Sequence, residues 1–89
     1  MNTPYLEVTY RRGRAIAAYY YLPRRPGQRS MRTRRVEGGL LVDYARGGRP
    51  IGVEITNPGA LSVAACNRVL RQLGVASVTR EDVAPLIAA

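Results

Sequence analysis

Residues 38–55 read GGLLVDYARGGRPIGVEI, and this stretch decides the fold of the chain. Its apolar residues recur at every second position in each half: Leu40, Val42 and Tyr44, then Ile51, Val53 and Ile55. A period of two predicts half-buried antiparallel strands, because successive side chains of a strand point to opposite faces. Gly47 and Gly48 supply the positive φ that a tight turn needs. The stretch therefore predicts a β-hairpin with one apolar side.

The same period predicts three earlier strands. Residues 5–10 alternate, and residues 15–22 follow with two fairly apolar faces, which predicts a central strand. Two prolines and a glycine in 23–27 then interrupt the pattern. Residues 29–36 form the third predicted strand, and their four arginines indicate an edge guarded by charge.

From residue 61 the apolar period changes from 2 to 3.6, which predicts a helix capped by Ser62 and running to Leu73. Thr79 is placed to cap a second helix, which Pro85 would kink or shorten. The predicted fold class is α+β: an antiparallel five-stranded sheet followed by two C-terminal helices packed on one face. We expect a single domain over residues 1–89, with the sheet in 5–56 and the helical tail in 61–88.

A chain of 89 residues buries a small core, so its stability is marginal without reinforcement. One cysteine, Cys66, excludes an intrachain disulfide, and the absence of histidine argues against a conventional zinc cluster. Self-association, as a dimer, or a partner protein is the expected reinforcement. The cytoplasm is the expected compartment, because no signal peptide or long apolar run is seen and a lone cysteine suits a reducing environment.

The formal net charge is +8, and every basic residue is arginine. A field of this size attracts anionic partners such as nucleic acid, an acidic protein surface or anionic lipid.

Asp43 and Glu54 are the acidic residues of the predicted hairpin, and pairing of its strands would bring them close together. Two such carboxylates could act as acid and base or hold a metal. The interpretation we favour is that they are solvated or pair with Arg46 and Arg49, because no third ligand or histidine completes a site. Cys66 lies on the apolar stripe of the helix without a base to activate it, so we assign it to the core.

Tyrosines and arginines of neighbouring segments form the candidate contact surface for an interface or an anionic partner: Tyr19, Tyr21, Arg24, Arg25, Arg29, Arg32, Arg34 and Arg35. Single-strand binders place aromatic rings and guanidinium groups in this way on a sheet face. Packing and a protein interface are the alternative, since both residue types are also enriched in interfaces. We favour packing or a protein interface, because no recognised nucleic-acid motif is found.

Residues 39–44, GLLVDY, and 48–55, GRPIGVEI, resemble the hairpin motif of domain-of-unknown-function family 2283, a group of small prokaryotic proteins. The stretch from Tyr10 to Tyr21 is more loosely similar to the family's upstream motif, with arginines in a turn where the family has aspartates. The resemblance implies a compact antiparallel sheet with C-terminal helical packing and no assigned chemistry. Some members are encoded beside small toxin-like proteins, which implies an antitoxin-like binding role for those members.

The sequence thus predicts a non-enzymatic protein-binding module without cofactor or metal. Its expected partner is another copy or a small toxin-like or acidic protein. The alternative is an RNA- or DNA-binding module that uses the arginine-rich segment 24–35.

Overall fold

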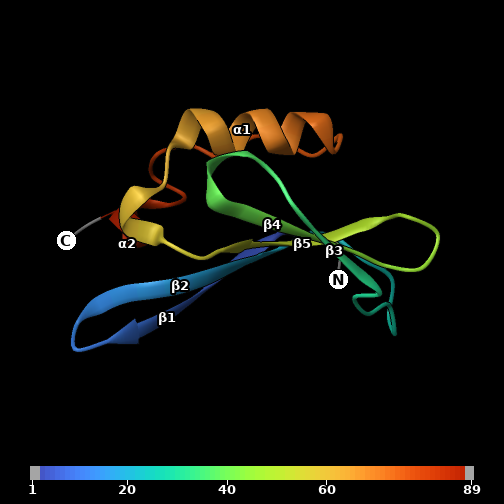
Figure 1. Cartoon of the computed structure of the whole chain (residues 1–89), viewed down its shortest axis with the longest axis horizontal. Helices are drawn as coiled ribbons and strands as arrows, with labels where there is room; N and C mark the ends of the chain where they lie inside the picture. The colour runs from blue at the N-terminus through green and yellow to red at the C-terminus, as the bar shows by residue number, and fades with distance from the viewer. Residues whose placement is uncertain (1–2, 88–89) are drawn as a thin grey trace.

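Five antiparallel strands form one sheet in the computed structural model, which describes residues 3–87 (Figure 1). The strands are β1 (Tyr5–Arg11), β2 (Arg14–Tyr21), β3 (Arg32–Arg35), β4 (Leu40–Tyr44) and β5 (Pro50–Ile55). Their order across the sheet is β1-β2-β5-β4-β3, and every neighbouring pair is antiparallel. The predicted α+β class and five-stranded antiparallel sheet are confirmed.

The hairpin predicted at 38–55 is formed by β4 and β5. Leu40 lies opposite Ile55 and Val42 lies opposite Val53, so the two apolar stripes share one side of the sheet. These four side chains are buried, as is Ile51. Gly47 and Gly48 have φ values of 89° and 90°, which confirms their predicted role in the turn.

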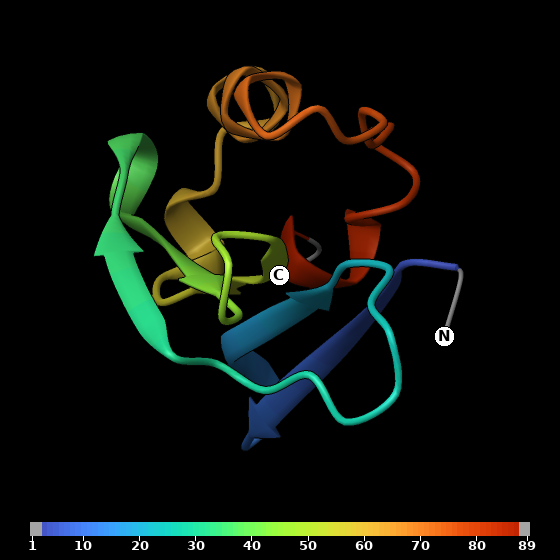
Figure 2. The same ribbon diagram turned by 90° about the vertical axis from the view of Figure 1, so that its right-hand side faces the viewer.

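The middle strand of the sheet is β5. The predicted central strand, β2, is an interior strand between β1 and β5, but it is one place away from the middle. Residues 22–31 carry the chain from β2 around one end of the sheet to the opposite edge, on the side away from the helix (Figure 2). The chain then returns through β3, β4 and β5 until β5 pairs with β2.

The two edge strands differ in length and charge. Strand β3 spans four residues, shorter than the predicted 29–36, because only Arg32–Arg35 pair with β4. All four are exposed, as predicted for a charged edge. Strand β1 spans seven residues and carries only Glu7 and Arg11 as charged side chains.

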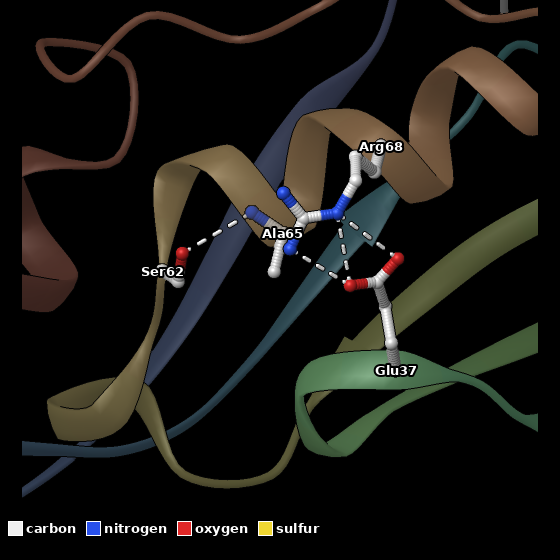
Figure 3. A network of polar contacts seen from close by, with 4 residues as sticks. All are labelled: Glu37, Ser62, Ala65 and Arg68. Atoms are coloured by element: carbon white, nitrogen blue, oxygen red, sulfur yellow. Dashed lines mark hydrogen bonds and ion pairs between the residues drawn. The ribbon is translucent and has the colours of Figure 1, made fainter.

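Helix α1 (Val63–Gln72) covers one face of the sheet (Figure 1). The hydroxyl of Ser62 accepts a hydrogen bond of 3.1 Å from the Ala65 N–H, which confirms the predicted cap (Figure 3). The helix buries Ala65, Cys66, Val69 and Leu70 against the sheet.

The second predicted helix is wrong in extent: α2 (Ala84–Ile87) is a single turn. Thr79 and Asp82 exchange hydrogen bonds, because the Thr79 N–H donates to the Asp82 carboxylate and the Asp82 N–H donates to the Thr79 hydroxyl. The cap is therefore present, but Pro85 lacks an N–H and its ring clashes with a helical carbonyl four residues earlier. Ala88, the last residue of the predicted tail, lies outside the described residues.

Polar side chains of α1 contact the tail and the turn before β4. The Asn67 amide donates to the Val78 carbonyl at 3.0 Å and accepts from the Val78 N–H at 2.8 Å. Val78 is thereby held in the core together with Val83 and Leu86. On the outer side of α1, the Arg68 guanidinium binds the Glu37 carboxylate at 2.9 Å (Figure 3). Glu37 begins the 3-10 turn η1 (Glu37–Gly39), which leads into β4.

Candidate interaction surface

The face of the sheet opposite α1 is covered by neither α1 nor α2 (Figure 1). Strand alternation and register give this open face its residues: Tyr5, Glu7, Thr9, Arg11, Ala17, Tyr19, Tyr21, Thr33, Arg35, Leu41, Asp43, Gly52 and Glu54. Their strand neighbours, such as Leu6, Tyr20 and Val53, point to the helical side and join the core. The open face is therefore aromatic and polar, whereas the covered face is apolar.

Three tyrosines of the open face form an ordered cluster. The rings of Tyr5 and Tyr21 stack with centroids 4.5 Å apart, and Tyr19 meets Tyr21 edge-on at 4.6 Å. The Tyr21 hydroxyl donates to Glu7 at 3.2 Å. The guanidinium carbon of Arg24 lies 5.4 Å from the centroid of the Tyr21 ring, a cation–π contact. Offset and edge-on pairs add stability beyond the area that they bury, so these rings hold one another in place.

A chain of polar contacts crosses the sheet beside this cluster. The Tyr19 hydroxyl of β2 donates to one Asp43 oxygen of β4 at 2.6 Å, and the Thr33 hydroxyl of β3 donates to the other at 2.5 Å. Tyr19 reaches Asp43 across Gly52 of β5, where a Cβ atom would overlap the tyrosine ring. Glycine is required there because the aromatic ring occupies the place of a side chain.

Burial and the neighbouring Asp43 carboxylate raise the pKa of Tyr19 well above its ordinary value of 10.0. Burial also raises the pKa of Tyr21, and the Glu7 carboxylate adds to this effect. Both hydroxyls, which are protonated at neutral pH even at the ordinary pKa, therefore stay protonated to higher pH and act as donors to their carboxylates.

Arg24 and Arg25 follow the tyrosine cluster in the chain. Arg24 donates to the Ile51 carbonyl at 2.6 Å while it contacts Tyr21, so its guanidinium is held by the sheet. The exposed Arg25 joins Tyr5, Tyr21 and Arg24 around a shallow cleft of about 250 Å³. The structure thus brings four residues together here, of which the sequence predicted Tyr21, Arg24 and Arg25.

The remaining predicted arginines lie elsewhere. Arg32 packs over the Tyr44 ring at 5.2 Å, and Arg34 lies opposite Val42, which places both on the helical side of β3. Arg35 points the other way, opposite Leu41, and Arg29 is exposed in the segment before β3. The predicted tyrosine–arginine surface is therefore divided between the two faces of the sheet.

The surroundings of the other candidate residues, Asp43, Glu54 and Cys66, correspond to structural roles. Asp43 lies opposite Gly52 and Glu54 lies opposite Leu41, so the two carboxylates are diagonal neighbours and not a direct pair. Asp43 accepts hydrogen bonds from the hydroxyls of Tyr19 and Thr33, and it does not pair with the predicted Arg46 or Arg49. Cys66 is buried, and burial raises the pKa of its thiol, as expected for a core cysteine. Within residues 3–87, no group of three or more carboxylate or thiol side chains could hold a metal ion.

The sequence prediction missed four contributors to the open face: Tyr5, Glu7, Thr33 and Gly52. Tyr5 and Glu7 alternate with apolar residues along β1, so the pattern places them on the correct side of their strand. Their contacts with Tyr21 require the register between β1 and β2, which the pattern does not give. Gly52 has no signal beyond being a glycine inside a predicted strand, which can indicate close approach by another group.

Comparisons with family models, curated proteins and solved structures found no match to this chain. The resemblance to family 2283 is not tested by these comparisons and stays a prediction. In the described part of the chain, no helix has both the length and the apolar character to cross a bilayer.

Proposed function

We propose that the chain is a non-enzymatic protein-binding module that associates with a second copy of itself or with a small toxin-like or acidic protein. The observation that carries this proposal is the open face with its ordered cluster of Tyr5, Tyr19 and Tyr21. Tyrosine and arginine dominate the residues that contribute most to protein interfaces. We expect the module to act in the cytoplasm.

The cluster is suited to binding because its side chains are already fixed. Tyr19 is held by Asp43, and Tyr21 is held by Glu7, by Tyr5 and by Arg24. Ordering a free side chain on binding costs about 0.5–1.5 kcal/mol, and this cost is reduced where the side chain is ordered beforehand. The antitoxin-like role implied by the resemblance to family 2283 would use such a surface.

The open face carries both signs of charge, since Arg11 and Arg35 share it with three carboxylates, and this mixture favours a protein over a nucleic acid there. Glu7, Asp43 and Glu54 make up three of the six acidic residues of the chain, and all three share this face. A phosphate backbone would be repelled by them, whereas a protein can place donors or arginines opposite them.

The RNA- or DNA-binding alternative rests on the arginines in and beside the edge strand β3, away from the tyrosine cluster. Arg29, Arg32, Arg34 and Arg35 are exposed in or beside the edge strand β3, and the net charge is +8. Neutralisation of phosphates by such residues gives an affinity that falls steeply with salt concentration.

The proposal is tested with material purified from the host cell of the chain. We expect a protein to co-purify in fixed ratio, and the Tyr5→Ala/Tyr21→Ala variant to bind that purified partner about tenfold or more weakly. An Arg71→Ala variant, changed on the exposed side of α1, is the control and should bind as the wild type does. Sedimentation of the pure chain over a range of concentrations measures association with a second copy.

A different outcome would favour the alternative. The test is a titration with a random single-stranded oligonucleotide at about 50 and 200 mM salt. Tight binding at the lower salt that collapses at the higher salt, without effect of the tyrosine substitutions and without a protein partner, would replace the protein-binding proposal.

A further inference from the structure

The two edges of the sheet are protected to different degrees. Strand β3 is short and carries three arginines. Short length and charged side chains both keep an edge strand from pairing with another strand. Strand β1 is longer, and its charged side chains, Glu7 and Arg11, have opposite signs. Tyr5 and Tyr10 on this strand are 49% and 55% exposed. Among the described residues, no strand lies on the outer side of β1.

We propose that β1 pairs antiparallel with β1 of a second copy, so that two sheets become one continuous sheet across a two-fold axis. This inference rests on the self-association in the proposed function and assigns the contact between copies to the β1 edge and not to the open face. An unpaired edge strand offers a row of backbone donors and acceptors, which an identical strand can satisfy reciprocally.

Charge selects the register of this pairing. The single irregularity between β1 and β2 places the extra residue, Ile16, in β2, so alternation along β1 is unbroken. Glu7, Thr9 and Arg11 therefore share the open face. With Thr9 opposite Thr9 of the second copy, Glu7 lies opposite the second copy's Arg11, and this contact occurs twice.

Neighbouring registers lack this match. Centring the pair on Glu7 places two carboxylates opposite each other, which destabilises a strand pair. Centring it on Val8 leaves Glu7 opposite Thr9 and forms no ion pair. The Thr9-centred register also sets Val8 against the exposed Tyr10 ring of the second copy, which extends the apolar layer on the helical side.

Charge reversal with rescue tests the proposal. Sedimentation should show wild-type dimer, and Glu7→Arg or Arg11→Glu should each raise the dissociation constant about tenfold or more, because both ion pairs become like-charge pairs. An equimolar mixture of the two variants restores both ion pairs and should form a heterodimer. The double variant Glu7→Arg/Arg11→Glu should form a homodimer for the same reason.

Matched controls distinguish the effect of β1 pairing on the dimer from the effect of net charge. Glu81→Arg and Arg46→Glu change the net charge by the same amounts at exposed positions outside β1, and they should leave the dimer unchanged. Thr9→Cys should form an intermolecular disulfide on oxidation, whereas Ser77→Cys should not.

Each other outcome counts against the proposal. A wild-type dimer that is indifferent to both reversals, or variants that fail to recover on mixing, would refute pairing through β1 and leave self-association intact. A wild type that stays monomeric up to about millimolar concentration would refute both the β1 pairing and the self-association. Circular dichroism of each variant confirms that the variant is folded before its oligomeric state is deduced from sedimentation.

Discussion

The two faces of the sheet are held by different chemistry. Under α1, side chains such as Val42, Val53 and Leu70 are at most 1% exposed and pack without polar partners. On the open face, order comes from directed contacts, in which Tyr19 and Tyr21 bind the carboxylates of Asp43 and Glu7. Apolar burial is non-directional and depends on area and fit, whereas each hydrogen bond depends on the position of one donor and one acceptor.

This difference separates the residues that stabilise the fold from those of the proposed interaction surface. Removal of apolar volume from the covered face should affect the whole fold. Changes on the open face should cost less stability and mainly alter the arrangement of the tyrosines. Four substitutions test this contrast, in order of decreasing expected effect.

The largest effect is expected from Leu70→Ala in α1, whose side chain is fully buried. The lost transfer energy and the remaining cavity should lower the free energy of unfolding by about 3–4 kcal/mol. Urea unfolding followed by circular dichroism measures this change. Leu70→Val removes less volume and gives a measurable value if the alanine variant unfolds, and Arg71→Ala is an exposed control on the same helix. A loss below about 1 kcal/mol for Leu70→Ala would contradict the role of the covered face.

Gly52→Ala should have the next largest effect. The new Cβ displaces the Tyr19 ring and breaks its contact with Asp43, so we expect a loss of about 2 kcal/mol. The control is the same substitution in a Tyr19→Ala background, where the space over Gly52 is vacant and the added cost should be much smaller. Equal costs in the two backgrounds would show that Tyr19 does not depend on this glycine.

Tyr19→Phe should lower stability by about 1 kcal/mol at neutral pH, because it removes only the hydrogen bond to Asp43. The effect should depend on pH. The pKa of Tyr19 is raised in the folded state, so its stabilisation is complete below the ordinary value of 10.0 and is lost as the pH rises above it. Unfolding measured from pH 8 to about 11 should therefore show a steeper loss for the wild type than for Tyr19→Phe. Parallel pH profiles would contradict this assignment.

The smallest effect is expected from Arg68→Ala, which removes the exposed ion pair between α1 and Glu37. Exposed pairs contribute little, and salt screens them, because the Debye length is about 3 Å at 1 M ionic strength. The urea midpoints of wild type and variant should differ slightly at low salt and coincide at high salt. A large difference that persists at high salt would mean that this contact, and not apolar packing, fastens the helix.

The covered face could be predicted from the sequence, and the open face only in part. Alternation at Leu40, Val42, Ile51 and Val53, followed by helical spacing in the tail, is enough to indicate a sheet with a helical cover. These patterns are local, and burial reinforces them along each element. The shortness of the last helix also follows from a local cause, Pro85.

The contacts of the open face depend on register and on distant pairing, which leave little trace in one sequence. A regular hairpin that continued from Arg11 opposite Arg14 would place Tyr5 opposite Tyr20. The extra residue in β2 shifts the register, so that Tyr5 meets Tyr21 instead. The role of Gly52 similarly requires that β5 lie beside β2, a pairing between segments that are far apart in the sequence.

The position of β5 in the middle of the sheet has a consequence for biosynthesis. The inner edge of β2 acquires its neighbour only when residues 52–55 are available, so a nascent chain that has emerged only as far as β3 has a hairpin with two open edges. Strand pairings between distant segments slow folding, and unpaired strand edges favour aggregation during that interval. On ribosome-bound chains from which residues 50–55 have not yet emerged, we therefore expect the first hairpin to be accessible to protease, and to become protected once Ile55 has left the ribosome.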